Sequence, residues 1–341
     1  MNSPADSCSA FPVSREFPSP LRGGVGEGDG CRPPRICPSP HPGPPPQWGR
    51  GFGAAPVAQQ LTGGRLHLSH GPIDVVLRAF GAPEAVARAH QAAARRFPDI
   101  LPELCAELPR LRAQLGKSLP PLSSVGRRMA AACRPFADVF VTPMAAVAGA
   151  VAEELLSVMR AAAPLDRAYV NDGGDIAVFC ALGKVMDIAI ASDFTLGPLP
   201  GRSGTIRVRH GDGVGGIATS GARGRSFSLG IADSVTALAA DAATADVAAT
   251  LIGNAVDCDD PAIGRRPACG LDPDSDLGDR LVTVHVAPLS QHVVETALKR
   301  GLACARRYRA RGLIVDAALT LQGRTVTLGG EVPASMERVA L

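Results

Sequence analysis

The sequence predicts a single α/β (α+β) domain with mixed sheets and packed helices, and three observations support this fold class. Of the 341 residues, 46% are hydrophobic and 20% are charged, as in globular proteins with a sizeable core. Only 4% are aromatic, so the core must consist mainly of Ala, Val, Leu and Ile. Segments with period-two alternation and segments with helical periodicity follow one another along the chain, without a regular strand–helix–strand count.

Residues 1–60 differ in composition from the rest of the chain, and we place the predicted domain at residues 61–341. They are rich in Pro and Gly and show no apolar periodicity. Such a segment cannot bury enough surface to offset its ordering entropy, so a disordered tail is expected. A second interpretation stays open, because the strings 19–24 and 41–46 resemble translated intergenic repeat DNA of GC-rich bacteria. The true start would then lie downstream.

The predicted domain opens with two strands and a long helix. Alternating apolar residues predict strands over 65–70 and 73–79, on either side of a turn. Ala and Leu at helical spacing predict a helix over 84–108. This helix is expected to be interrupted near Pro98 and Pro102, because proline removes a backbone donor.

A second helix is predicted after a loop at residues 116–126. Thr142 is expected to cap it and Pro143 to occupy its first position, where the missing N–H costs nothing. The helix should run to about residue 162. Small residues along it, Gly149 among them, suit close packing, either within the chain or across a homodimer interface.

The rest of the chain is predicted to alternate between strands and helices. Strands are expected, from apolar alternation and turn residues, within 168–182, 185–191, 206–210, 235–239 and 281–287. Helices are expected at 244–254 and 292–311, the second ending before a glycine. A hairpin is expected over 313–328, with Gln322 and Gly323 at its turn.

Charge and cysteine content argue against several classes of function. The net charge is +3 and the basic residues form short pairs, without the stripe or the interleaved aromatics of nucleic-acid binders. The nine cysteines include no CxxC pair, so neither a disulfide framework nor a zinc site is expected. No apolar run approaches the roughly 20 residues of a membrane span, and no signal-peptide pattern is visible. The sequence therefore predicts a soluble, cytoplasmic protein.

Two patterns carry residue types that suit ligand chemistry. Asp246 and Thr250 stand four apart on a predicted helix, so they share one face and offer two hard oxygens. This suits Mg²⁺ held partly by substrate phosphates; the alternative is an ordinary helix with two outward polar residues. Gly173 and Gly174 can adopt positive φ and admit a ligand close to the backbone, with Asp175 as an acceptor for a nucleobase or ribose. The alternative is a simple hairpin turn.

A third pattern is a candidate phosphate cradle. Thr219, Ser220 and Gly221 offer hydroxyls and a flexible backbone, and Arg223 and Arg225 add guanidinium groups. A solvated loop is the alternative interpretation.

Residues 211–216 satisfy a GxGxxG pattern that we do not interpret as a dinucleotide site. The Rossmann fingerprint requires a helix directly after the glycines, and its N-terminus holds the pyrophosphate. Here residues 217–221 predict a strand and a turn.

Five sequence blocks in these segments follow one another along the chain. Residues 142–150 read TPMAAVAGA and residues 171–176 read NDGGDI, and further blocks lie at 216–221, 226–236 and 245–254. In this order they resemble the GPMAAVAGA block, the NGGDI block and the remaining blocks of a bacterial and archaeal family related to ApbE, the FAD:protein FMN transferases. The likeness extends over about residues 65–330. It implies an ApbE-like, T-fold-related domain that binds FAD and Mg²⁺ and transfers FMN to a Ser or Thr of an acceptor protein.

The resemblance also implies roles for particular residues. It makes Gly173, Gly174 and Asp175 the flavin-side turn. It matches Asp246 and Thr250 to the Asp and Thr of an "ADALAT" block that ligate Mg²⁺. Metal-assisted attack on the FAD pyrophosphate would follow.

One departure from the family's pattern leaves the activity open. Transferases of the family carry a His and an Asp-Pro-x-Thr-Gly element before the next strand, and residues 222–233 contain neither. Three hypotheses stand: an FMN transferase or FAD-cleaving enzyme; a non-catalytic flavin- or nucleotide-binding protein or redox-enzyme assembly factor; and a structural homologue with an empty site.

Overall fold

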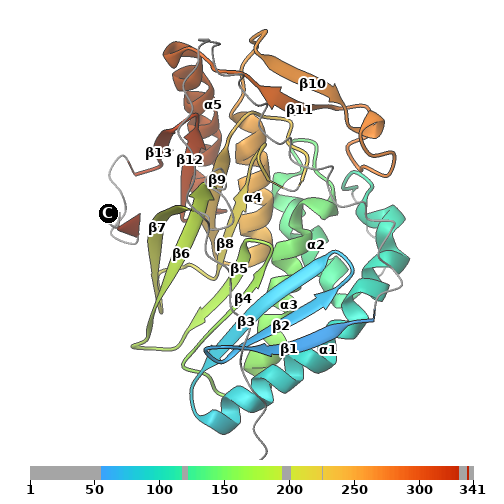
Figure 1. The fold of residues 1–341 in the computed structure, drawn as a ribbon, viewed down its shortest axis with the longest axis vertical. Helices are drawn as coiled ribbons and strands as arrows, with labels where there is room; N and C mark the ends of the chain where they lie inside the picture. Colours follow the sequence, from blue (N-terminus) through green and yellow to red (C-terminus); the bar gives the residue numbers. More distant parts are fainter. Residues whose placement is uncertain (1–54, 117–121, 194–200, 225, 330–335, 338–341) are drawn as a thin grey trace, which may run out of the picture. The chain divides into compact units, whose positions relative to one another are not determined.

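A nine-stranded antiparallel sheet forms the centre of the domain (Figure 1). The computed structural model describes residues 55–116, 122–193, 201–224, 226–329 and 336–337, and all of them belong to one compact unit. The sheet order is β1-β2-β3-β4-β5-β8-β9-β12-β13. The bounds of these strands are β1 (Val57–Leu61), β2 (Arg65–His70), β3 (Ile73–Phe80), β4 (Arg167–Asp172), β5 (Asp175–Cys180), β8 (Gly216–Ser220), β9 (Ser234–Ala239), β12 (Asp316–Leu321) and β13 (Arg324–Thr327).

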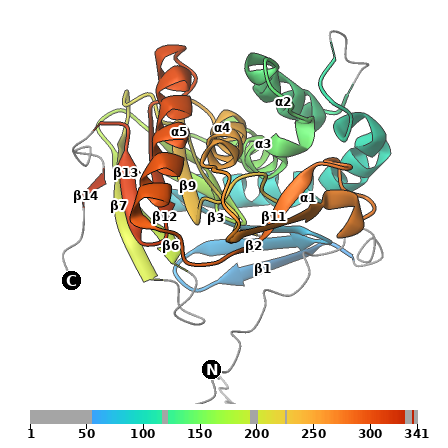
Figure 2. The ribbon, with the colours of Figure 1, turned by 90° about the horizontal axis from the view of Figure 1, so that it is seen from above.

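The helices lie on one face of this sheet (Figure 2). The helices that contact its strands are α1 (Pro83–Leu111), α3 (Val147–Ala162), α4 (Ala242–Ala255) and α5 (Gln291–Ala310). Helix α2 (Ser124–Cys133) packs against α1, α3 and α4. The main core between helices and sheet consists largely of Ala, Val, Leu and Ile, as the scarcity of aromatics predicts. Short 3₁₀ turns are η1 (Arg134–Phe136), η2 (Pro143–Ala146) and η3 (Ala268–Gly270).

The opposite face of the sheet carries a second, smaller sheet. It consists of β6 (Val185–Asp193), β7 (Gly201–Arg209) and β14 (Met336–Glu337), in the order β14-β7-β6. Because side chains alternate along a strand, β5, β8 and β9 contribute side chains to the apolar cores on both faces of the sheet. Their outer positions form a second apolar cluster with β6 and β7, which includes Ile176, Val178, Met186, Ile188, Ile206, Ile217 and Leu238. A separate hairpin pairs β10 (Ile263–Pro267) with β11 (Leu281–Val286).

The predicted α/β domain with packed helices is confirmed. The sheets are not mixed as expected, because every strand pair in the described residues is antiparallel. Strand β8 begins at Gly216, the last of the glycine-rich residues 211–216, and no helix follows them directly, which confirms that they do not form a Rossmann turn. Among the helices of the described residues, none has both the length and the apolar character that a membrane crossing requires.

The predicted interruption of the first helix is wrong. Helix α1 continues through Pro98, Pro102 and Pro109. Pro102 and Pro109 are exposed, so the carbonyl groups that they leave unbonded one turn earlier can be solvated. The opposite side of the helix buries Phe97 and Ile100 among other apolar residues, and this burial outweighs the local penalty of the prolines.

The predicted start of the helix at Thr142 and Pro143 is also wrong in detail. Residues Pro143–Ala146 form the 3₁₀ turn η2, and α3 begins at Val147. Thr142 makes no capping hydrogen bond; its hydroxyl donates to the carboxylate of Asp276 instead. A partner 134 residues away in sequence has replaced the local capping contact.

Several elements were not predicted, helix α2 and strands β10 and β1 among them. Helix α2 begins inside the predicted loop at 116–126, capped by Ser123, whose hydroxyl accepts a hydrogen bond from Gly126 N at 3.1 Å. Strand β10 is a second omission. Strand β1 starts at Val57, so the boundary that we predict between residues 60 and 61 falls within a strand.

Candidate functional site

Three aspartates come together on the helix-covered side of the sheet. Asp172 ends β4, Asp175 begins β5, and Asp246 lies on α4. Burial raises the pKa of Asp246 well above its ordinary value, and the negative charges of Asp175 and Asp172 raise it further. The site therefore concentrates negative charge where solvent screening is weak.

The N-terminal turn of α3 faces Asp246. The backbone N–H of Gly149 donates to Oδ2 of Asp246 at 3.1 Å. This contact opposes the rise in pKa, because a hydrogen bond and the positive end of a helix dipole both favour a carboxylate. A Cβ at Gly149 would lie 2.3 Å from the carbonyl oxygen of Ala242, so only glycine permits this approach of α3 to α4. The small residue predicted for close packing is thus used within the chain.

Asp246 and Thr250 share one side of α4, as their spacing predicts, and both are half-buried. Asp246 meets α3, whereas the hydroxyl of Thr250 donates to Oγ of Ser220 on β8 at 3.4 Å. The carboxylate and the two hydroxyls together provide the hard oxygen atoms that Mg²⁺ prefers.

The turn between β4 and β5 adopts the backbone conformation that its glycines suggest. Gly173 has φ +64° and Gly174 has φ +118°. The side chain of Asn171 accepts a hydrogen bond from Gly174 N at 2.9 Å and fixes the turn. Apart from Gly174 and its two neighbours in the chain, no atom of the described residues lies within 4 Å of the position that a Cβ of Gly174 would take. The segment is a hairpin turn with open space beside it.

The predicted phosphate cradle does not form a single cluster. Thr219 and Ser220 are neighbours on β8, so their side chains point to opposite faces of the sheet. The hydroxyl of Thr219 bonds to that of Thr236 at 2.9 Å on the outer face. Only its backbone N–H reaches the site, where it donates to Oδ1 of Asp175 at 3.1 Å.

The remaining cradle residues are engaged in other ways. Gly221 is buried, and a Cβ there would lie 2.5 Å from the carbonyl oxygen of Asp233. Arg223 is paired with the carboxylate of the same Asp233 at 2.8 Å. Arg225 lies outside the described residues.

Two contributors to the site were missed from the sequence. Asp172 is directly opposite Asp175 in the β4–β5 register, so a hairpin with a two-residue turn places both carboxylates together. That pairing was deducible from the predicted turn. The contact of Gly149 with Asp246 was not, because 97 residues separate them.

The donor set fits Mg²⁺ on its chemistry but does not form a complete cage. In the described part of the chain, no group of three or more His, Cys, Asp or Glu side chains is arranged to hold a metal ion. A cation at Asp246 and Thr250 would need further oxygens from water or from ligand phosphates, which is how Mg²⁺ is usually held.

A comparison with known families decides the relationship of the chain. The sequence model of the family described as AbpE bacteria matches residues 58–327. The chain belongs to this family. The match confirms the resemblance to an ApbE-related family that the sequence blocks indicate.

Two curated relatives of this chain come from archaea. The UPF0280 protein MK0206 of Methanopyrus kandleri is 40% identical over 138 residues, which cover 40% of this chain and 51% of the relative. A UPF0280 protein of Methanothrix thermoacetophila is 37% identical over 125 residues, 36% of this chain and 50% of the relative. The chain thus spans about half the length of the curated relatives that it matches.

Two solved structures show a distant likeness to the AbpE bacteria chain. A mutant of the flavin transferase ApbE from Vibrio cholerae has a TM-score of 0.43 and is 13% identical in sequence. The superposition covers 81% of this chain and 98% of the Vibrio cholerae chain. The apo flavinyl transferase ApbE of Pseudomonas stutzeri has a TM-score of 0.38 and 12% identity, with coverage of 80% and 94%.

Proposed function

We propose that this chain is an Mg²⁺-dependent flavin-nucleotide-binding protein that transfers FMN from FAD to an acceptor protein or cleaves FAD. One observation carries the proposal. Asp246 is placed between the N-terminus of α3 and two further carboxylates, beside the hydroxyls of Thr250 and Ser220. Asp172 is buried and Asp175 and Asp246 are half-buried, and carboxylates gathered in such positions repel one another unless a proton or a cation is shared between them.

Each part of the site has a role in this proposal. Asp246 and Thr250 hold the cation. The backbone of Gly173 and Gly174 gives the flavin nucleotide close access, and Asp175, positioned by Thr219 N, accepts a hydrogen bond from it. Bound Mg²⁺ supplies charge neutralisation at the pyrophosphate.

A second function, a non-catalytic flavin or nucleotide carrier or assembly factor, has an observation of its own. The segment that carries the catalytic element in the resembling transferases is short here. Its last residue, Asp233, is held by Arg223 at 2.8 Å and by Gln322 N at 2.5 Å, which are contacts of a structural residue.

The first test is FAD binding to the full chain by calorimetry and fluorescence, with Mg²⁺ and with EDTA. We expect Mg²⁺ to tighten binding at least tenfold, about 1.4 kcal/mol. Asp246→Asn should remove this dependence on Mg²⁺ while leaving the fold intact. Asp99→Asn, on the exposed side of α1, is the matched control and should keep it.

The outcomes separate the hypotheses. If Mg²⁺ tightens FAD binding to Asp246→Asn as much as it does to the unsubstituted protein, Asp246 does not hold the metal ion. Chromatography of the incubated FAD then distinguishes the two functions. Release of AMP identifies an enzyme, whereas intact bound FAD identifies a carrier.

A further inference from the structure

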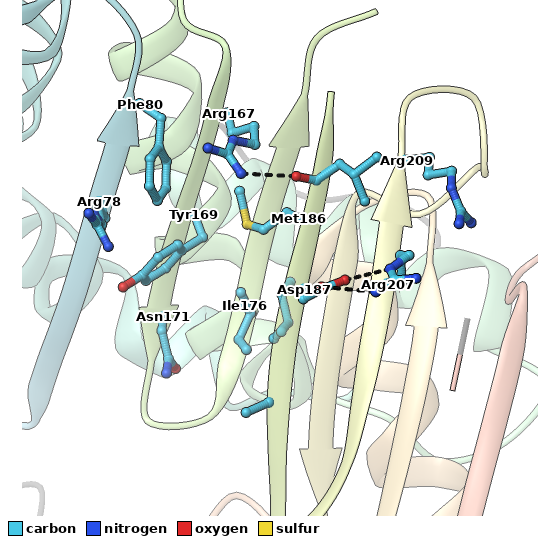
Figure 3. A pocket seen from close by; sticks show the side chains of 13 residues that line it. Arg78, Phe80, Arg167, Tyr169, Asn171, Ile176, Met186, Asp187, Arg207 and Arg209 are labelled. Carbon is cyan, nitrogen blue, oxygen red and sulfur yellow. Dashed lines mark hydrogen bonds and ion pairs between the residues drawn. The ribbon is translucent and has the colours of Figure 1, made fainter. Parts of the chain in front are cut away.

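A groove of about 720 Å³ lies on the face of the sheet opposite to the helices (Figure 3). Its floor is made by outward-facing side chains of β3 and β4, among them Phe80 and Tyr169. These residues alternate with Leu77, Ala79, Ala168 and Val170, which face the helices. The groove is therefore separated by the sheet from the Asp246 site and does not depend on the function proposed for that site.

One wall of the groove is the edge of β6. Five consecutive residues of this strand, Val185 to Ala189, line it. In the sheet order β14-β7-β6, strand β6 pairs with β7 on one side only, so in the described residues its other edge is unpaired. An unpaired strand edge is a template for another strand.

The backbone of β6 is oriented toward the groove at alternate residues. Nη1 of Arg167 on β4 donates to the carbonyl of Val185 at 3.0 Å, so this carbonyl points into the groove. Backbone groups alternate in direction along a strand, and the N–H and C=O groups of Asp187 and Ala189 therefore point the same way.

The groove is strongly basic. Its lining residues include four arginines and one acidic residue, Asp187. Arg207 is neutralised by Asp187 through hydrogen bonds of 2.8 and 3.1 Å (Figure 3). Arg78 and Arg167 both lie over the ring of Phe80, with guanidinium carbons 4.3 and 4.5 Å from its centroid. Stacking fixes these guanidinium groups and leaves their edges for acceptors.

Arg78 and Arg209 are the two arginines of the groove whose guanidinium groups have no hydrogen bond or ion pair to a protein acceptor in the part of the chain that the structure describes. Arg209 is exposed, whereas Arg78 is half-buried. A charged group held in this way gains from a carboxylate partner more than a solvated surface arginine would.

We infer that this groove binds an extended acidic segment of a partner protein, which adds as a strand to the free edge of β6. Backbone hydrogen bonds to Asp187 and Ala189 would give register, and carboxylates at alternate positions would reach Arg78 and Arg167. Five residues of β6 at about 3.3 Å each offer roughly 16 Å, enough for a segment of similar length. Charge complementarity selects an acidic partner over an apolar one.

The test uses the full chain and a fluorescein-labelled heptapeptide of alternating Glu and Thr, with binding measured by fluorescence anisotropy. We expect Arg78→Ala to weaken binding about tenfold. Arg266→Ala, on the exposed side of β10, is the matched control and should leave the affinity unchanged. Thermal unfolding of each variant verifies that the fold is retained.

Two further arms test strand addition itself. Ala189→Pro removes one N–H from the free edge, a position where proline is tolerated, and should weaken binding about tenfold. A peptide methylated on alternate backbone nitrogens keeps its charge but loses its donors, and should bind equally weakly.

Three results would overturn the inference. Equal affinity for the methylated and unmethylated peptides would show charge attraction without strand pairing. Unchanged affinity in both Arg78→Ala and Ala189→Pro would place the peptide elsewhere. Arg78-dependent binding of inorganic phosphate or ADP, with no peptide binding, would identify a small-anion site instead.

Discussion

His90 is a buried histidine without a role in either site. It lies on the inner side of α1, and its Nε2 has no hydrogen-bond partner in the described residues. Burial lowers the pKa of His90 below the ordinary 6.5. Below about pH 6.5 the unfolded chain therefore binds a proton that the folded chain does not, and the free energy of unfolding must fall.

We expect the stability lost between about pH 7 and pH 5 to be smaller in His90→Leu, because leucine cannot take up the proton. Urea unfolding at several pH values measures it. The same substitution at exposed His292 is the control and should leave the pH dependence unchanged. Identical pH slopes in His90→Leu and the unsubstituted protein would show that His90 is not responsible.

The pH dependence that Asp246 gives to the free energy of unfolding has the opposite sign to that of His90. Burial and the charges of Asp175 and Asp172 raise its pKa in the fold. As the pH rises above the unfolded value, about 3.9, ionisation is easier in the unfolded chain, so the carboxylate costs stability at neutral pH. An asparagine can still accept the hydrogen bond from Gly149 N without carrying the charge.

Asp246→Asn should therefore raise the Tm of the metal-free protein at pH 7, by roughly 2–4 °C for each kcal/mol of repulsion relieved. Mg²⁺ should raise the Tm of the unsubstituted protein, because a ligand that binds the folded state stabilises it, but not that of the variant. A lower Tm of the metal-free variant would mean that the α3 N-terminus already compensates the charge.

Two helical glycines of similar setting should respond to alanine in opposite directions. At Gly149 on α3, a Cβ would lie 2.3 Å from the carbonyl oxygen of Ala242, whereas at Gly253 on α4 its nearest neighbour would be 3.9 Å away. Gly149→Ala should lower the free energy of unfolding by about 1–3 kcal/mol through overpacking. Gly253→Ala should raise it by up to about 1 kcal/mol through helix propensity.

Chemical denaturation measures both effects, and Mg²⁺ titration of Gly149→Ala adds a functional readout. If the approach of α3 positions Asp246, the Gly149 variant should also lose affinity for Mg²⁺. If Gly149→Ala is as stable as the unsubstituted protein, α3 can move away from α4 at little cost in free energy.

Local chemistry explains which elements were predictable. The hairpin of β12 and β13 was expected because Gln322 and Gly323 suit its turn, and they adopt φ +44° and +79°. Gly312 ends α5 with φ +71°, as a C-terminal glycine does. The Gly173–Gly174 turn was found for the same reason. In each case one or two adjacent residues determine the conformation.

Contacts distant in sequence explain the errors. The hydroxyl of Thr142 bonds to Asp276 and does not cap the helix that follows it. The prolines of α1 are tolerated because the other side of the helix is buried. The division of Thr219 and Ser220 between two faces needed only strand alternation, applied to a strand that was predicted. The basic groove joins Arg78, Arg167 and Arg207 from three strands, which no local pattern brings together.

The central sheet separates two sites of opposite charge. Period-two alternation sends Asp172 and Asp175 to the helix side, where they meet Asp246, and sends Tyr169 and Asn171 to the outer groove. The same hairpin, β4–β5, therefore serves both. A strand docked at β6 would bring its protein to the sheet that carries the Gly173–Gly174 turn, without occupying the carboxylate side.

The domain boundary gives the last prediction. Strand β1 begins at Val57 and the family match at residue 58, which supports a folded unit that starts just before them. A truncated chain beginning at Ala55 should keep its Tm, since the residues removed belong to the predicted tail. A chain beginning at Thr62 loses β1 and leaves β2 as the sheet edge. Because β1 is largely exposed, the cost should be modest, about 1–2 kcal/mol, or roughly 2–8 °C in Tm. Calorimetry of both chains measures this difference, and a large fall in Tm for the first truncation would contradict the predicted tail.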